Sequence, residues 1–219
     1  MRPSRVCTWV VLLIAVLFSR EASAQGVRIV AIGDSNTAGF GVARDEAFPA
    51  RLEALLRAAG HEAQVWNAGI AGDTFGDISA RLDGYVPDGI HIAIVQGGYN
   101  DVLRRTDPNS IVAHLESILS RLRARRINVV LCGFFYPDWD AVGATLARKY
   151  RAVFVDGGAC YDSGYRGSDG LHMSAAGHQV VAARLLPTIE SLLPTATALP
   201  SRHRDRHPAS VTAHHGRTP

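Results

Sequence analysis

Short apolar runs alternate with amphipathic stretches along most of this chain, and this alternation limits the folds that it can adopt. Five runs are predicted to be buried strands: Val27–Ile32, Ala63–Trp66, Ile90–Val95, Ile127–Phe135 and Ala152–Val155. Five stretches have helical periodicity: Glu46–Ala59, Asp73–Leu82, Pro108–Arg125, Trp139–Tyr150 and Ser174–Leu193. Apolar strands that alternate with helices predict an α/β fold, in which a five-stranded parallel sheet is covered on both faces.

The N-terminal end of the chain departs from this pattern. Arg2 and Arg5 precede an apolar run that is too short for an ordinary membrane span, and Ala22–Ala24 forms a small-residue cleavage site. We therefore expect residues 1–24 to be a signal peptide and the mature protein to begin at Gln25. The alternative is an uncleaved N-terminal anchor. Cleavage predicts a protein of the periplasm or the medium, with no stable membrane anchor.

The C-terminal end is also expected to lie outside the fold. Residues 194–219 are rich in Ala, Thr, Pro, Ser, Arg and His, which predicts a disordered tail. The formal net charge of the chain is +3; the leader carries +2 and the tail +3, which leaves −2 for residues 25–193. That balance does not support a nucleic-acid or anionic-membrane partner. Residues 25–193 are long enough for one domain, which we expect to be monomeric.

Segments that could carry chemistry follow the predicted strands. Gly33–Asn36 follows the first strand, Asn67–Asp73 the second and Gly98–Asp101 the third, while Asp169–His172 lies in the long loop after the fifth. In parallel sheets, functional residues gather beyond the carboxyl ends of the strands. We therefore expect these four segments to meet at one site.

Three of these residues have the chemistry of a serine hydrolase. Ser35 is the candidate nucleophile, His172 its base and Asp169 the group that orients the base, since one loop can deliver an Asp and a His three residues apart. Each motif alone is more typical of an ordinary loop. We expect Asp34 to fix the turn through backbone hydrogen bonds. His178 competes as base, but no acid lies three residues before it.

The same segments offer donors for an oxyanion. Asn100 follows a buried strand and two glycines, where its side-chain amide needs a partner. Gly72 directly precedes a predicted helix start, so its amide should lack a helical partner. With the Ser35 amide, these groups predict an oxyanion hole of three donors.

These residues, in this order, resemble the SGNH (GDSL-type) hydrolase family. The four residues of the family name match Ser35, Gly72, Asn100 and His172, and the family acid matches Asp169. Asn67–Gly69 and Gly72–Thr74 are most similar to the exported bacterial thioesterase I, lysophospholipase and arylesterase group. The resemblance implies a three-layer α/β/α sandwich of flavodoxin-like form, no cofactor or metal, and hydrolysis of esters or thioesters.

The substrate is less well defined by the sequence. Tyr99 stands where the thioesterase group often has glycine, and Tyr136–Trp139 begins a segment shorter than the acyl-chain loop of that group. We expect Tyr99, Phe75 and Tyr136 to contact substrate. Six aromatic residues near the site could line an apolar groove, with core packing as the alternative for several: Phe40, Phe75, Tyr99, Phe135, Tyr136 and Trp139.

The sequence therefore predicts a serine esterase that works through an acyl-enzyme on a small-molecule ester or thioester. A carbohydrate O-acetyl esterase is the alternative enzyme, and a non-catalytic module that binds glycan or lipid is the alternative of another class. Cys132 and Cys160 both follow predicted strands. An oxidising compartment would allow a disulfide between them, and two buried thiols remain the alternative.

Overall fold

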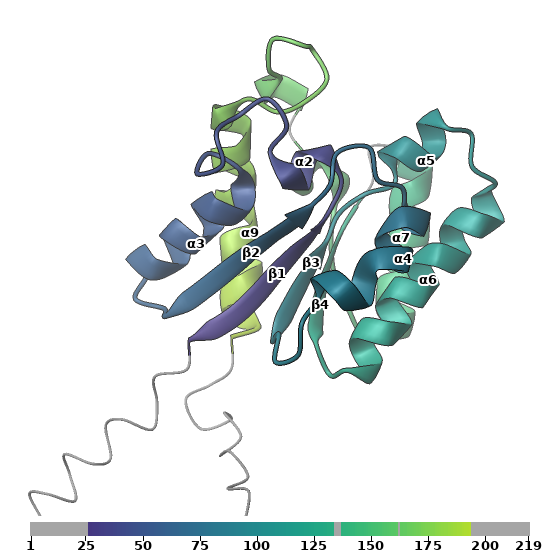
Figure 1. Ribbon diagram of the computed structural model, residues 1–219, viewed down its shortest axis with the longest axis horizontal. Helices are drawn as coiled ribbons and strands as arrows, with labels where there is room; N and C mark the ends of the chain where they lie inside the picture. The colour runs from purple at the N-terminus through teal and green to yellow at the C-terminus, as the bar shows by residue number, and fades with distance from the viewer. Residues whose placement is uncertain (1–25, 134–136, 162, 194–219) are drawn as a thin grey trace, which may run out of the picture.

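The computed structural model describes residues 26–133, 137–161 and 163–193. The predicted signal peptide and tail, and the candidate substrate contacts Phe135 and Tyr136, lie outside these residues. Five parallel strands form one sheet in the order β2-β1-β3-β4-β5 (Figure 1). Their bounds are β1 (Val27–Gly33), β2 (Ala63–Gly69), β3 (Ile92–Val95), β4 (Asn128–Cys132) and β5 (Val153–Val155). The predicted five-stranded parallel sheet is confirmed.

Helices cover both faces of this sheet, which gives the three layers that the resemblance implies. In Figure 1, α3 (Phe48–Ala58) and α9 (Ala175–Ser191) lie on one side, and α4 (Phe75–Tyr85), α6 (Pro108–Ala124) and α7 (Pro137–Tyr150) lie on the other. The shorter elements follow strand ends or loops: α2 (Ser35–Ala38), α5 (Tyr99–Leu103), α8 (Gly157–Cys160) and a 3-10 turn at Ser163–Tyr165.

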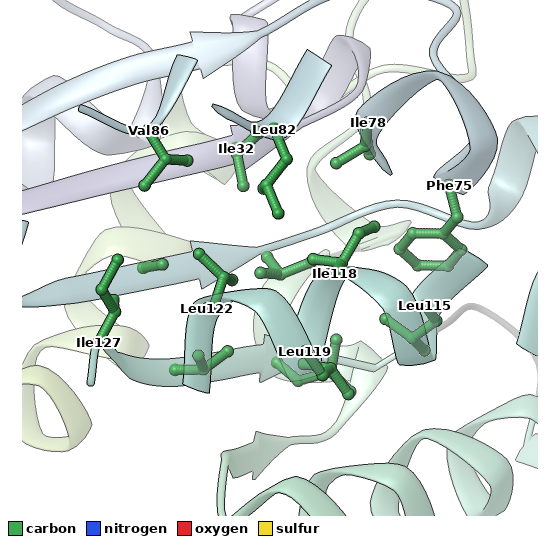
Figure 2. Close-up of a cluster of buried hydrophobic side chains, with 14 of the residues drawn as sticks. Ile32, Phe75, Ile78, Leu82, Val86, Leu115, Ile118, Leu119, Leu122 and Ile127 are labelled. Carbon is green, nitrogen blue, oxygen red and sulfur yellow. The ribbon is translucent and has the colours of Figure 1, made fainter. Parts of the chain in front are cut away.

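Strand β1 shows why the apolar runs are continuous. Val30 and Ile32 pack into the core on the α4 and α6 side, whereas Ile29 and Ala31 pack into the core on the α3 and α9 side. All four side chains are fully buried. Successive side chains of a strand point to opposite faces, so a strand covered on both faces needs apolar residues at every position. Figure 2 shows the first of these cores, with Ile32 against the side chains of α4 and α6.

Three of the longer helices begin directly after a residue whose polar side chain caps them. Thr74 caps α4 in a capping box with Asp77, Asp107 caps α6, and Ser174 caps α9. The sequence did not predict α2, α5 and α8, and it ended β2 at Trp66. Strand β2 continues for three residues because Asn67, Ala68 and Gly69 pair in register with Ala31, Ile32 and Gly33 of β1.

Strand β2 lies at an edge of the sheet, and side chains occupy two of its amides. The Val65 amide donates to Glu53 Oε2 at 2.7 Å. The Gly69 amide donates to Asn67 Oδ1 at 3.0 Å. These bonds use backbone donors that an edge strand otherwise leaves unpaired. Within the described residues, no helix has both the length and the hydropathy that a membrane span needs.

Candidate active site

Ser35 lies at the tight turn between β1 and α2. An added Cβ at Gly33 would lie 2.3 Å from Thr37 Oγ1 and 2.5 Å from the Gln96 carbonyl oxygen, so only glycine fits there. Asp34 caps α2 by accepting a hydrogen bond from the Asn36 amide at 2.9 Å. The first residue of a helix has no partner for its amide within that helix. The turn therefore presents both the hydroxyl and the amide of Ser35 at the end of the strand.

Asp34 supports this turn from within the core. Its side chain is buried, and burial raises the pKa of its carboxyl group, partly offset by hydrogen bonds from the Asn36 amide and the Gln96 side chain. Gln96 also accepts a hydrogen bond from Thr37 Oγ1 at 2.8 Å. These contacts agree with the expectation that Asp34 fixes the turn.

Asp169, His172 and Ser35 form one continuous chain of hydrogen bonds. His172 Nδ1 donates to Asp169 Oδ2 at 2.6 Å, and Ser35 Oγ lies 3.0 Å from His172 Nε2. An ionised carboxylate only accepts hydrogen bonds, so Nδ1 carries the ring proton and Nε2 is free to accept one from the serine. The structure thus brings the three predicted catalytic side chains together from opposite ends of the sequence.

Local hydrogen bonds hold the carboxylate of this chain. Asp169 Oδ1 accepts from the amides of Leu171 and His172, each at 2.9 Å. The hydrogen bond from the His172 ring, together with these two amides, lowers the pKa of Asp169 to about 2. Asp169 is therefore ionised throughout the pH range in which esterases are normally assayed.

Three candidate donors belong to residues that line one cavity beside the serine. The amides of Ser35 and Gly72 make no hydrogen bond with any described residue. Asn100 Nδ2 donates one of its two protons to the Asp73 carbonyl at 2.9 Å, which leaves the other free. All three residues line the cavity, and Gly72 has a φ of +89°, a backbone conformation that favours glycine.

The cavity has a volume of about 320 Å³ and largely apolar walls. Its lining includes Tyr99, as the sequence predicts, together with Phe40, Leu103 and Leu171. Phe40 is 51 % exposed, and its ring centroid lies 4.5 Å from that of His172. Sequence reasoning missed Leu103 and Leu171 as lining residues. Both residues lie close in sequence to the Asn100 and His172 motifs, and this proximity could have indicated that they line the cavity.

Two of the predicted substrate contacts have other outcomes. Phe75 is fully buried in the core between α4 and α6 (Figure 2), so the prediction that it contacts substrate is wrong. Phe75 is the first residue of α4, whose apolar side faces the sheet. Its side chain therefore packs into the core, although the residue is close to the site in sequence. Tyr136 lies outside the described residues. Trp139 is partly buried and packs against the same core as Phe75.

His178, the competing candidate for the base, is a core residue, and two other histidines make contacts away from the site. His178 is fully buried; its Nδ1 accepts a hydrogen bond from the Phe48 amide at 3.2 Å, and burial lowers its pKa to about 4. It therefore stays neutral and links α9 to α3. His91 Nδ1 accepts a hydrogen bond from the Arg28 amide, and His61 Nε2 lies 3.3 Å from Glu190 Oε1.

Cys132 and Cys160 form a disulfide, which decides between the two alternatives for these residues. Their Cα atoms are 5.7 Å apart. The bond joins the end of β4 to α8, the first element of the segment that leads to Asp169 and His172. Within the described residues, no group of three His, Cys, Asp or Glu side chains is arranged to hold a metal ion.

Comparison with known proteins identifies relatives of this chain in sequence and in fold. The model of the GDSL-like Lipase/Acylhydrolase family matches residues 31–180. The esterase TesA of Pseudomonas aeruginosa is 28 % identical over 194 residues, covering 83 % of this chain and 96 % of TesA. An arylesterase of Vibrio mimicus is 30 % identical over 151 residues, covering 66 % of this chain and 71 % of that protein. Among solved structures, AlinE4, an SGNH-hydrolase family esterase, is 32 % identical with a TM-score of 0.61, covering 78 % of this chain and 99 % of AlinE4.

Proposed function

The chain belongs to the GDSL-like lipase/acylhydrolase family and is a carboxylic ester hydrolase, and from that premise we propose that Ser35 carries the acyl group during turnover. His172 is the general base and acid, and Asp169 orients it. The amides of Ser35 and Gly72 and the side chain of Asn100 form the oxyanion hole. The observation that supports these roles most strongly is the unbroken hydrogen-bond chain from Asp169 through His172 to Ser35.

The reaction runs in two symmetrical halves. Ser35 Oγ attacks the carbonyl carbon of the ester while its proton passes to His172 Nε2, and the carbonyl oxygen becomes an oxyanion that accepts hydrogen bonds from the three donors. His172 then gives the proton to the departing alcohol or thiol, which leaves the acyl group on Ser35. Water repeats the same steps and releases the carboxylic acid. The ionised Asp169 stabilises the imidazolium that forms in each half.

The walls of the cavity favour an apolar acyl group. Tyr99, Leu103 and Leu171 line it together with the oxyanion donors, so an acyl chain bound there would bury apolar surface on both partners. Leu103 is 59 % exposed, so the walls reach the surface of the molecule. We propose that Tyr99, which lines the cavity directly before Asn100 in the chain, limits how closely a long acyl chain can approach Asn100.

We also propose that the protein is exported by the predicted leader 1–24 and that residues 25–193 are the catalytic domain. The Cys132–Cys160 disulfide supports export, because disulfides persist mainly in oxidising compartments. Mass spectrometry of the protein recovered from the periplasm and the medium, with Gln25 as the expected first residue, tests this proposal. Recovery of the full chain from the membrane fraction would contradict it.

The test of the catalytic proposal is Ser35→Ala. We expect no measurable hydrolysis of p-nitrophenyl butyrate and no labelling by a fluorophosphonate, with an unchanged melting temperature. Ser120→Ala removes a serine hydroxyl on α6 whose hydrogen bond is to the Ser117 carbonyl, and it should keep both activities. Esters of increasing acyl length, acyl-CoA thioesters and acetylated xylan then define the substrate class. Normal turnover by the Ser35 variant would reject the assignment.

A further inference from the structure

Arg81 lies on α4, behind the proposed catalytic groups, and its guanidinium contacts three separate segments. Nε donates to Asp73 Oδ2 at 2.6 Å. Nη1 donates to the Ala68 carbonyl at 2.9 Å, and Nη2 donates to the Gly33 carbonyl at 3.0 Å. The side chain is 12 % exposed, so these bonds form largely out of contact with water. The guanidinium carbon lies over the Tyr85 ring, 4.7 Å from the ring centroid, and this contact further restricts the conformation of the Arg81 side chain.

Each acceptor lies beside a proposed catalytic group. Gly33 ends β1, two residues before Ser35. Ala68 lies at the end of β2, where the chain turns toward Gly72. Asp73 directly follows Gly72, and its carbonyl accepts the hydrogen bond from Asn100. One planar cation therefore connects the nucleophile turn to both of the other oxyanion donors.

Only a guanidinium fits this set of acceptors. Its donors lie in one rigid plane and can reach two carbonyls and a carboxylate at once, whereas a lysine ammonium is a point charge on a flexible stem. Asp73 is buried. After the larger effect of burial, its proximity also raises the pKa of Asp34, which lies beside Ser35. Without the fork of Arg81, the paired ends of β1 and β2 would lose their side-chain connection to Asp73, and the turn that carries Gly72 could shift relative to Ser35.

We propose that Arg81 is a positioning residue that sets the Ser35 and Gly72 amides and the Asn100 side chain at the spacing that the tetrahedral oxyanion requires. This inference rests on the proposed function of those three donors. Arg104 also contacts this region, because its Nη2 donates to the Gly72 carbonyl at 2.7 Å. Its side chain is 57 % exposed, so water competes for its bonds and its contribution is smaller.

The test is Arg81→Lys, which keeps a positive charge beside Asp73 and removes the fork. We expect kcat for p-nitrophenyl butyrate to fall about 10- to 100-fold with little change in KM, because a small displacement of oxyanion donors affects only the transition state. The matched control is Arg125→Lys. Arg125 also donates to two backbone carbonyls, those of Val86 and Pro87, but these lie at the end of α4 remote from the cavity. The control should keep the wild-type kcat.

A pair of inhibitors separates positioning from general damage. Ser35 Oγ adds to the carbonyl carbon of a hexyl trifluoromethyl ketone, its proton passes to His172, and the ketone oxygen becomes an oxyanion in the hole. The matching trifluoromethyl carbinol fills the same cavity without forming that charge. In Arg81→Lys, we expect the ketone to lose affinity by the same factor as kcat and the carbinol to keep its affinity. A purely structural role predicts equal losses for both compounds.

A second variant, Asp73→Asn, tests the same role from the acceptor side. If Arg81→Lys does not fold, Asp73→Asn, which retains an acceptor for Nε, should give the same selective loss of ketone affinity at about 3- to 10-fold. Equal ketone and carbinol losses in that variant, or a wild-type kcat in folded Arg81→Lys, would overturn the role of Arg81. Failure of the wild-type protein to bind the ketone or turn over the ester would instead reject the proposed function itself.

Discussion

The proposed active site has two halves that the fold holds in different ways. Ser35, Gly72 and Asn100 follow the carboxyl ends of β1, β2 and β3, three strands that are hydrogen-bonded side by side. Asp169 and His172 instead lie on a loop well beyond the end of β5. The register of the sheet sets the first half, whereas the second half depends on bonds within its own loop.

The bonds of the loop half are short-range in sequence. The Gly167 amide donates to the His172 carbonyl at 2.7 Å, and the Tyr161 hydroxyl donates to the Leu171 carbonyl at 2.7 Å. The disulfide joins the start of this segment to the sheet. This difference indicates that changes in the loop half should alter kcat with little effect on stability, whereas changes in the sheet half should alter both.

The largest effect should come from Asp169→Asn in the loop half. An asparagine amide cannot hold His172 in the tautomer that accepts the serine proton, so we expect kcat to fall by about 10⁴. The melting temperature should change little, since Asp169 is partly exposed and bonds only within its loop. Steady-state kinetics and thermal unfolding measure the two effects. Asp107→Asn, at the cap of α6 away from the site, is the control for the loss of a carboxylate.

Asn100→Ala should show the contrasting behaviour of the sheet half. Loss of an oxyanion donor should lower kcat by about 10²–10³. The Asp73 carbonyl also loses its partner, so the free energy of unfolding should fall by about 1 kcal/mol. Urea unfolding and kinetics on the same samples test both effects. Asn109→Ala, on the exposed start of α6, should change neither, and unaltered stability of Asn100→Ala would weaken the distinction between the halves.

Removing the disulfide should sharpen the comparison. The bond closes a loop with a sequence separation of 28 residues, so the double variant Cys132→Ser/Cys160→Ser should lose about 3–4 kcal/mol of unfolding free energy. Because the bond connects the loop half to the sheet, activity should disappear on heating before the helical circular dichroism signal does. Coincident loss of both signals, as in the oxidised protein, would show that the loop has no separate dependence on the bond.

The effect of His178 on stability should appear only at acid pH. The pKa of His178 is about 4 in the folded protein and about 6.5 when the chain is unfolded, so the unfolded state takes up the proton first. The stability from its neutral form is complete above pH 6.5 and is lost as the pH falls toward 4, by up to about 3 kcal/mol. His178→Asn keeps an acceptor for the Phe48 amide and does not titrate. Its melting temperature should therefore depend less on pH between 6.5 and 4, and an unchanged slope would contradict this account.

The sequence predicted the sheet and the longer helices because their apolar periodicity spans many residues. Helices of four or five residues, such as α2 and α5, carry too few positions for such a period to be recognised. The residues of the proposed site could be grouped from the sequence because three of the four motifs follow strand ends, which the topology of a parallel sheet places together. Asp169 and His172 lie beyond β5 and were assigned from their spacing. Phe75 was assigned to the wrong environment because residue order does not reveal which way the first turn of a helix faces.

Some contacts between distant segments could not be predicted from the sequence. The separation of Cys132 and Cys160 depends on how α8 packs against β4, and no local pattern reports it. The three hydrogen bonds of the Arg81 guanidinium could not be predicted from the sequence either, because a single arginine on an amphipathic helix is typical of a solvated face. Phe40 was among the aromatic residues considered for the groove, but the contact between its ring and the His172 ring requires the fold to bring those segments together.

The side-chain bonds at the β2 edge have a consequence for the behaviour of the protein at high concentration. A sheet grows into a filament when the border strand of one molecule accepts a strand from another. Glu53 and Asn67 already hold two of the donors that an incoming strand would need. Intermolecular polymerisation through this border would first have to break both hydrogen bonds, which makes it less favourable.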